Sequence, residues 1–121
     1  MNSNVAAATA FLNAMKAKDL AQAPVSESVS YSSPLSGVTI HGREHMLRFV
    51  SVYLPVINDV RVVRHIAEGD YVATVWNAET SFGLLSMVWV FRVEAEKIVE
   101  IQAFYDPRGF LERLGTWAGA Q

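Results

Sequence analysis

Apolar residues recur every three or four positions at the start of the chain and every second position in its later half. Val5, Leu12 and Met15 share one face of a helix in the run VAAATAFLNAM. Ser3 or Asn4 is placed to cap the exposed amides of its first turn. We therefore expect the chain to begin with an amphipathic helix.

Two shorter helices are predicted between this helix and the later strands. Asp19 is placed to cap a turn over residues 20–23, which a proline follows. Helical spacing returns after Gly42, where Met46 and Val50 lie four residues apart, and Pro55 is expected to end that helix.

Five segments alternate apolar and polar residues in the manner of strands. VSESVSY precedes a turn at SSPLSG, and four longer segments follow: NDVRVVRHIA, YVATVWNAETS, LLSMVWVFRV and IVEIQAFY. Short turns join these four, so we expect an antiparallel meander. LLSMVWVF is apolar on both faces, whereas a strand with one solvated face alternates. Val88 and Val90 would therefore be covered by a second subunit, which predicts a homodimer through the outer sheet face.

The order of the elements predicts an α+β fold. A curved antiparallel sheet would wrap around the N-terminal helices and leave a blind pocket. DPRGFLERLGTWAG predicts a short C-terminal helix, with Asp106 as its N-cap and Pro107 in its first position. The length of 121 residues fits one domain, residues 1–121.

Composition narrows the partners of this domain. Hydrophobic residues make up 51% of the chain and charged ones 18%, which excludes a disordered protein. The net charge is −2 and the basic residues are scattered, so we expect no nucleic-acid partner. Cysteine is absent, which excludes thiolate sites and fits a reducing compartment, and no apolar run is long enough for a membrane span. We expect a soluble, cytoplasmic protein without a cofactor.

The three histidines are candidates for metal binding or acid/base chemistry. His41 and His45 lie four residues apart, as metal ligands on a helix do, but the glutamate of an HExxH motif is missing and Gly42 delays the helix. We therefore predict no metal site. His65 lies in the strand segment VRVVRHI, where a structural role and an acid/base role in a pocket both remain open.

Several segments together resemble one known superfamily. They are FLNAMKAKD, the SSP turn, HGREHMLRFV, AEGDYVATVW and KIVEIQAFYDPRGFLERLG, in this order along nearly the whole chain. The chain resembles the nuclear transport factor 2-like (NTF2-like) superfamily, and within it the SnoaL-like family related to polyketide cyclases and ketosteroid isomerases. The resemblance implies a cone-shaped fold, but this fold hosts enzymes and binding modules alike.

The resemblance also excludes one activity. Ketosteroid isomerases place a tyrosine on the first helix, an aspartate base before a proline, and a second acid on the penultimate strand. The matching positions here are Phe11, Ser33 and Trp89. A phenyl ring cannot donate to an oxyanion and a serine hydroxyl is too weak a base, so we expect no ketosteroid isomerase activity.

SnoaL-type cyclases carry an aspartate at the end of the last strand, and Asp106 matches that placement. The resemblance implies that Asp106 acts as a general acid/base, with His65 as a second candidate. The alternative is that Asp106 only caps the helix that follows it. A cavity of roughly 300 Å³ or more beside an inward-facing Asp106 would favour catalysis.

The candidate pocket wall consists of aromatic and sulfur-containing residues, which pack equally well in a filled core. They are Phe11, Met15, Tyr31, Tyr53, Trp76, Met87, Trp89 and Phe91. Two function classes follow. One is a cofactor-independent cyclase, isomerase or dehydratase acting on a small apolar substrate. The other is a non-catalytic module that binds a small hydrophobic ligand or only dimerises around a filled core.

Overall fold

The computed structural model describes residues 2–35 and 37–106. Two short helical stretches accompany two α-helices and six strands. In chain order the elements are α1 (Ser3–Ala17), η1 (Leu20–Gln22), β1 (Val25–Ser33), β2 (Val38–His41), α2 (Arg43–Ser51), η2 (Leu54–Val56), β3 (Ile57–Glu68), β4 (Tyr71–Thr80), β5 (Gly83–Glu94) and β6 (Lys97–Phe104). The predicted C-terminal helix lies outside the described residues.

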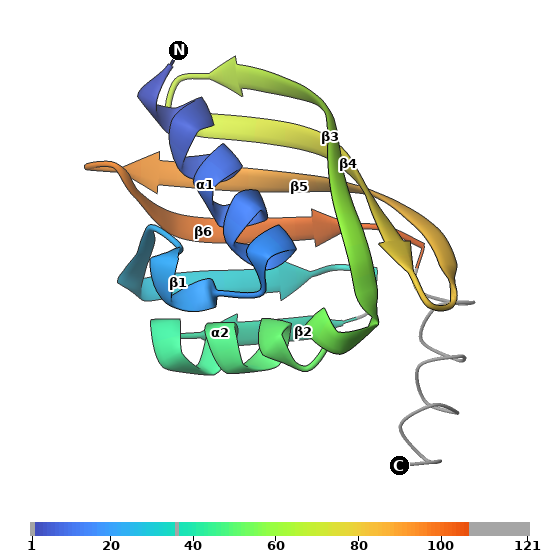
Figure 1. Ribbon diagram of the computed structural model, residues 1–121. Helices are drawn as coiled ribbons and strands as arrows, with labels where there is room; N and C mark the ends of the chain where they lie inside the picture. Colours follow the sequence, from blue (N-terminus) through green and yellow to red (C-terminus); the bar gives the residue numbers. More distant parts are fainter. Residues whose placement is uncertain (1, 36, 107–121) are drawn as a thin grey trace.

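The strands form one curved sheet in the order β2-β1-β6-β5-β4-β3. Its concave face holds α1, and α2 lies beside β1 and β2 (Figure 1). This arrangement confirms the predicted α+β fold. The sheet is mixed, however, because β1 pairs with β6 in parallel whereas every other pairing is antiparallel. The chain leaves β2 through α2 and enters the sheet again at the far edge, so the meander brings β6 back alongside β1 in the same direction.

Polar contacts join both ends of α1 to β3 and to the turn that follows it. The Asn4 side chain donates to the carbonyl of Gly69 at 3.1 Å, at the start of the helix. At its other end, Lys16 pairs with Asp59 at 3.3 Å. Arg61 and Lys16 also keep the pKa of the Asp59 carboxyl below its usual value, with Arg61 as the largest cause. The helix is therefore fixed across the mouth of the curved sheet.

The helix ends differ in detail from the predictions. Asn2 caps α1, since its side chain accepts from the amides of Asn4 and Val5. The side chain of Asp19 makes no capping bond to η1, which is a 3₁₀ turn. Helix α2 ends at Ser51, before the predicted stop.

Pro55 does not end α2; it lies inside η2, a separate 3₁₀ turn. A proline fits there because the first amides of a helical turn need no partner within it. The short strand β2 was not predicted. Its residues VTIH alternate apolar and polar, but four residues are too short a run to distinguish a strand from the turn before it.

The alternation of β4 and β5 sets the two faces of the sheet. Side chains such as Val72 and Trp76 are buried against α1, and their neighbours point to the outer face. Alternation counted back from Ala103 and Ile101 predicts that Val99 of β6 is buried. Ile98 is buried in place of Val99, because the register between β5 and β6 shifts after Arg92.

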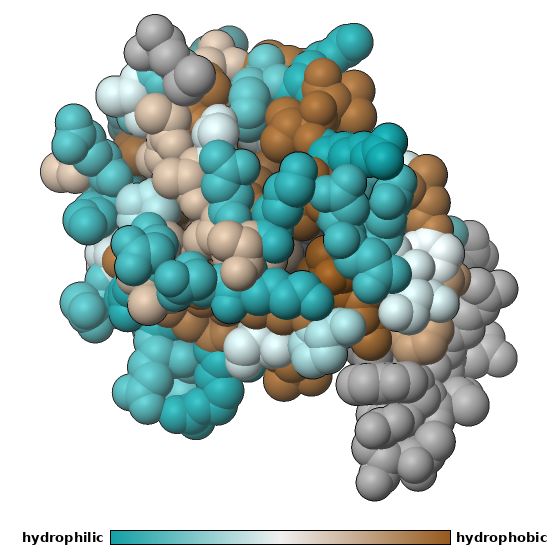
Figure 2. Space-filling model, in the orientation of Figure 1, coloured by the Kyte–Doolittle hydropathy of each residue, from teal (hydrophilic) through white to brown (hydrophobic). Residues whose placement is uncertain are grey.

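The core fills the space between α1 and the sheet. Its largest fully buried side chains include Trp76, Phe11 and Phe91. On the face shown in Figure 2, polar side chains cover most of the molecule, and an apolar patch lies over the bend of β3, where Val63 and Ile66 are more than half exposed. Within the described part of the chain, no helix is both long and apolar enough to cross a membrane.

Candidate functional site

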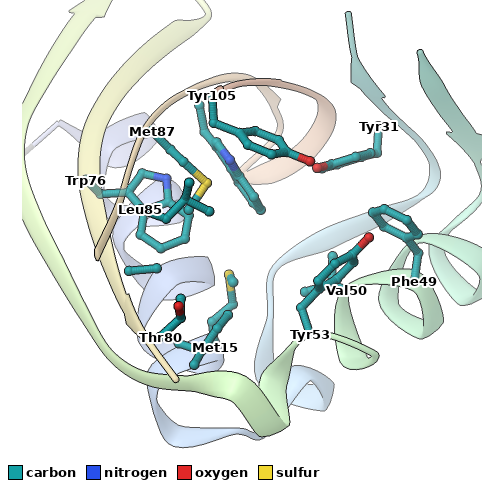
Figure 3. A pocket seen from close by; sticks show the side chains of 13 residues that line it. Met15, Tyr31, Phe49, Val50, Tyr53, Trp76, Thr80, Leu85, Met87 and Tyr105 are labelled. Atoms are coloured by element: carbon teal, nitrogen blue, oxygen red, sulfur yellow. The ribbon is translucent and has the colours of Figure 1, made fainter. Parts of the chain in front are cut away.

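An apolar cavity opens between α1, α2 and the concave side of the sheet (Figure 3). Its volume is about 50 Å³. That is room for roughly three to five water molecules, at about 10–15 Å³ for each. The cavity is thus smaller than the few hundred ångströms cubed expected for a preformed small-molecule site. Its described lining consists of Met15, Tyr31, Phe49, Val50, Tyr53, Ile57, Trp76, Ala78, Thr80, Leu85, Met87, Trp89 and Tyr105.

Two neighbouring strands provide one wall of the cavity. Trp76 and Ala78 project from β4, opposite their register partners Met87 and Leu85 on β5. Alternate residues of a strand share a face, so these four side chains point the same way. Figure 3 shows Trp76, Leu85 and Met87 together on one side of the cavity, with Met15 of α1 below them.

The opposite wall is a chain of aromatic rings. The ring centroids of Tyr31, on β1, and Phe49 lie 5.3 Å apart. Those of Phe49 and Tyr53 lie 5.2 Å apart. Trp89 joins this chain to the first wall. It meets Tyr31 edge-on at 5.7 Å and Trp76 edge-on at 5.2 Å. Edge-to-face contacts of this kind are favourable and fix the orientation of each ring.

Three tyrosines bring hydroxyl groups to this apolar wall. Figure 3 shows Tyr105 and Tyr31 reaching toward each other from opposite sides, with their hydroxyl oxygens facing. Burial raises the pKa of Tyr31, and the charges on Tyr105 and Tyr53 would raise it further. Burial is also the main cause that raises the pKa of Tyr53. The hydroxyls of Tyr31 and Tyr53 are therefore neutral hydrogen-bonding groups near pH 7.

Two buried donors in the cavity wall have no partner in the part of the chain that the structure describes. The indole nitrogens of Trp76 and Trp89 make no hydrogen bond within residues 2–35 and 37–106. Both side chains are buried, with exposed fractions of 0% and 4%. Buried polar groups are normally hydrogen-bonded, so two such donors in one cavity are unusual.

Six of the eight residues predicted for the pocket wall line the cavity: Met15, Tyr31, Tyr53, Trp76, Met87 and Trp89. Phe11 and Phe91 are absent from the lining. Both are fully buried behind Trp89, at centroid distances of 5.8 and 6.1 Å from its ring. They support the wall from the core side.

Sequence reasoning missed several lining residues, notably Phe49, Leu85 and Tyr105. Phe49 carried a usable signal, because it precedes Tyr53 by four residues and so extends the same helical face. Leu85 and Tyr105 lie two residues from predicted inward positions on their strands, Met87 and Ala103, and period-two alternation points to both.

The proposed catalytic residue Asp106 lies next to the cavity without lining it. Asp106 is exposed, although its neighbour Tyr105 is a lining residue. The helix that Asp106 is predicted to cap lies outside the described residues. Both interpretations of this carboxylate therefore stay predictions.

His65 contacts α1 rather than the cavity. Its Nε2 lies 3.2 Å from the hydroxyl of Thr9, and its Nδ1 lies 2.8 Å from the hydroxyl of Thr74. Burial lowers the pKa of the imidazole. Both ring nitrogens are thus engaged with hydroxyl groups, which is the geometry of a structural histidine.

The other two histidines show no metal geometry. Nδ1 of His45 lies 3.3 Å from the backbone oxygen of His41. His41 belongs to β2 and His45 to α2, so they do not share one helix. Among the described residues, no three His, Cys, Asp or Glu side chains cluster as metal ligands would.

Comparison with known proteins places the chain in a family. The family described as "Domain of unknown function (DUF4904)" matches residues 2–117. The chain belongs to the DUF4904 family. No curated protein matches its sequence.

Solved structures show the fold of this DUF4904 protein to be NTF2-like. A protein from Kribbella flavida DSM 17836 is 16% identical, with each chain fully covered and a TM-score of 0.86. An NTF2-like protein of unknown function from Cytophaga hutchinsonii ATCC 33406 is 14% identical, covers 89% of this chain and 94% of its own, and has a TM-score of 0.77. TerC, co-crystallised with polyporic acid, is 19% identical, with 92% and 97% covered and a TM-score of 0.76. At these identities the likeness concerns the fold alone.

The DUF4904 chain lacks acids at the positions compared with ketosteroid isomerases. Phe11 is buried in the core, and Trp89 occupies the strand position, where it lines the cavity. Ser33 is buried at the end of β1. None of these three side chains is a general base near neutral pH.

Proposed function

We propose that this protein binds a small apolar molecule in the cavity between α1, α2 and the sheet. The observation that carries the proposal is the lining, in which no described side chain bears a charge and six are aromatic. Small-molecule sites are concave and mainly apolar, with a few polar groups that orient the ligand. Here the tyrosine hydroxyls, the Thr80 hydroxyl and the indole N–H groups are such polar groups.

The size of the cavity sets the size of the ligand. A volume of about 50 Å³ has room for only a few non-hydrogen atoms without rearrangement. Larger ligands need the wall to move, and Phe49, Tyr53 and Leu85 are the lining residues placed to move, because each is only half-buried. The co-crystal of TerC with polyporic acid supports small-molecule binding by a protein of this fold.

A cofactor-independent enzyme is the second candidate. It rests on the position of Asp106, which follows the lining residue Tyr105 directly. In this alternative the Asp106 carboxylate would transfer a proton to or from a ligand at the cavity edge. Asp106 is exposed and does not line the cavity, which favours the binding role, because binding needs no such group.

We further propose that the protein is a homodimer through the outer sheet face. Val88 and Val90 of β5, with Val75 of β4 beside them, form an apolar strip on that face. Arg92 pairs with Glu100 at 3.4 Å at one end of the strip. An apolar centre with a charged rim is the usual anatomy of a subunit interface. A cytoplasmic location likewise stays a prediction, from the absence of cysteine.

The proposed binding function is tested by a thermal-shift screen of small apolar compounds. A ligand at 100 times its dissociation constant adds about 2.7 kcal/mol to the stability of the folded protein. The matched variants are Ala78→Val, which adds two carbons inside the cavity, and Ala67→Val, which adds them at an exposed position of β3. We expect Ala78→Val to abolish the shift and Ala67→Val to retain it. Equal shifts in both variants would place binding elsewhere.

A further inference from the structure

We propose that the cavity selects a neutral ligand with a hydrogen-bond acceptor, such as a small aryl ketone or quinone, which accepts from the indole N–H of Trp76 or Trp89. The inference rests on the proposed binding function and adds the chemical class of the ligand to it. Its starting point is the pair of buried indole donors in the cavity wall, neither of which has a partner among the described residues.

The Trp76 nitrogen faces two other lining side chains. Figure 3 shows it on the ring edge nearest Met87 and Leu85, both of which line the cavity. Trp89 stands edge-on to Trp76, with an angle of 86° between the two rings. Both indole nitrogens are covered by neighbouring atoms, each with less than 1 Å² of accessible surface, so a ligand reaches one of them by moving the lining side chains in front of it. An acceptor that does so relieves the cost of a buried donor without a partner.

The other polar groups of the described lining, the three tyrosine hydroxyls included, do not accept from either indole nitrogen. The Thr80 hydroxyl donates to the Gly83 carbonyl at 2.6 Å and accepts from the Phe82 amide at 3.1 Å, so it is engaged in the β4–β5 turn. Met87 and Met15 offer only thioether sulfurs, which are weak acceptors. The ligand itself must therefore bring the oxygen or nitrogen acceptor.

The surroundings favour a neutral acceptor over a charged one. No Lys, Arg or His is among the described lining residues, so a carboxylate would find no cation. Burial raises the pKa of both Tyr31 and Tyr53, which shows that this environment disfavours a negative charge. A cation is the opposite alternative, since aromatic faces attract cations. However, the N–H group of an indole ring points the positive end of its dipole outward and so repels a cation. Two such N–H groups in the lining have no partner among the described residues.

Four probes of similar shape separate these chemistries. Acetophenone carries a neutral acceptor, ethylbenzene carries none, benzoate carries an anionic acceptor, and benzyltrimethylammonium carries a cation. Dissociation constants are measured by calorimetry on the full chain. We expect acetophenone to bind more tightly than ethylbenzene by about 2- to 12-fold, the net effect of one neutral hydrogen bond. Benzoate and benzyltrimethylammonium are expected to bind more weakly than acetophenone.

Variants test which groups donate. Trp76→Phe and Trp89→Phe keep an aromatic ring but remove the N–H, so at least one of them should abolish the preference for acetophenone over ethylbenzene. Phe49→Leu is the matched control, because it removes a ring from the same lining without removing a donor. It should weaken both probes equally. A second measurement uses the unmodified protein, so it does not depend on whether a variant folds. Acetophenone should shift the indole proton signal of Trp76 or Trp89 downfield in nitrogen-15 NMR spectra.

The outcomes are distinguishable. Equal affinity for acetophenone and ethylbenzene, with no indole shift, overturns the inference but leaves the binding function intact. Tightest binding of benzyltrimethylammonium or of benzoate also overturns it, in favour of a charged ligand. If none of the probes binds and a broad screen finds no other ligand, the proposed function fails and this inference fails with it.

Discussion

Nδ1 of His65 and the hydroxyl of Thr74 lie 2.8 Å apart, across the register pair that joins β3 to β4. The other ring nitrogen reaches Thr9 on α1. One imidazole therefore links the edge of the sheet to the helix that covers it. Since Thr74 is fully buried, the link stands at the boundary of the core.

This link predicts a pH dependence of stability. Burial lowers the pKa of His65 in the folded protein below its usual value of 6.5. The folded state therefore favours the neutral ring, and its contribution to stability is fully present above pH 6.5 and is lost as the pH falls through the lower folded pKa. We expect the melting temperature to fall between pH 7 and pH 5. His65→Gln should flatten that slope, whereas His45→Gln should not, and an unchanged slope in His65→Gln would refute the assignment.

Phe11 is predicted to support the cavity without contacting the ligand. Phe11→Ala should lower the free energy of unfolding by about 3–5 kcal/mol, because it removes a fully buried ring. Phe11→Leu should lower the free energy of unfolding by a smaller amount and leave ligand affinity unchanged. Met15→Phe, on the same helix, changes a lining residue and should weaken binding. Denaturant unfolding and calorimetry measure the two effects, and a large loss of affinity in Phe11→Leu would place Phe11 at the ligand.

Two substitutions of Asp106 separate capping from catalysis. Asn caps a helix about as well as Asp, so Asp106→Asn should retain both stability and ligand affinity. Asp106→Ala should lower stability by about 0.5–2 kcal/mol if the residue is a cap. Thermal melts and binding measurements test this expectation. A substrate whose turnover falls about 100-fold in Asp106→Asn at unchanged melting temperature would establish the acid/base role instead.

The outer face of β5 is predicted to be a subunit interface. Replacing both Val88 and Val90 with Lys should convert a dimer to monomer or aggregate in light scattering, because it places charges in an apolar seam. Val52→Lys changes an exposed residue after α2 and serves as the control. A parent protein that is monomeric at all concentrations would contradict the interface.

Apolar runs bounded by turn residues made the long strands predictable. In β4 and β5 every second residue from Val72 to Thr80 and from Met87 to Val93 is buried, although LLSMVWVF in β5 is apolar on both faces. β2 was missed because its alternation, VTIH, extends over only four residues. Ile98 was missed because a register shift is set by the pairing partner, which local spacing does not reveal.

The cavity was only partly predictable. The alternation of side chains along each strand identified Trp76 and Met87 as inward-facing residues. It does not distinguish residues that line a cavity from residues that fill the core behind it. Phe91 points to the same side of β5 as Trp89 but lies deeper in the core. The distinction depends on how side chains from five or more segments pack together. The unpaired indole nitrogens likewise became visible only once their neighbours were in place.

The parallel pairing of β1 with β6 has a consequence for how the molecule assembles. Tyr31 pairs with Ile101, so this join closes a loop of about 70 residues, whereas β3 to β6 are joined by short turns. Closing long loops costs entropy before any contact compensates it, and such contacts slow folding. We expect the four-stranded meander to acquire amide protection first in pulsed hydrogen exchange, and β1 last. Tyr31 and Phe49 would take their places in the cavity wall only in that final step, so the cavity would be the last part of the protein to form.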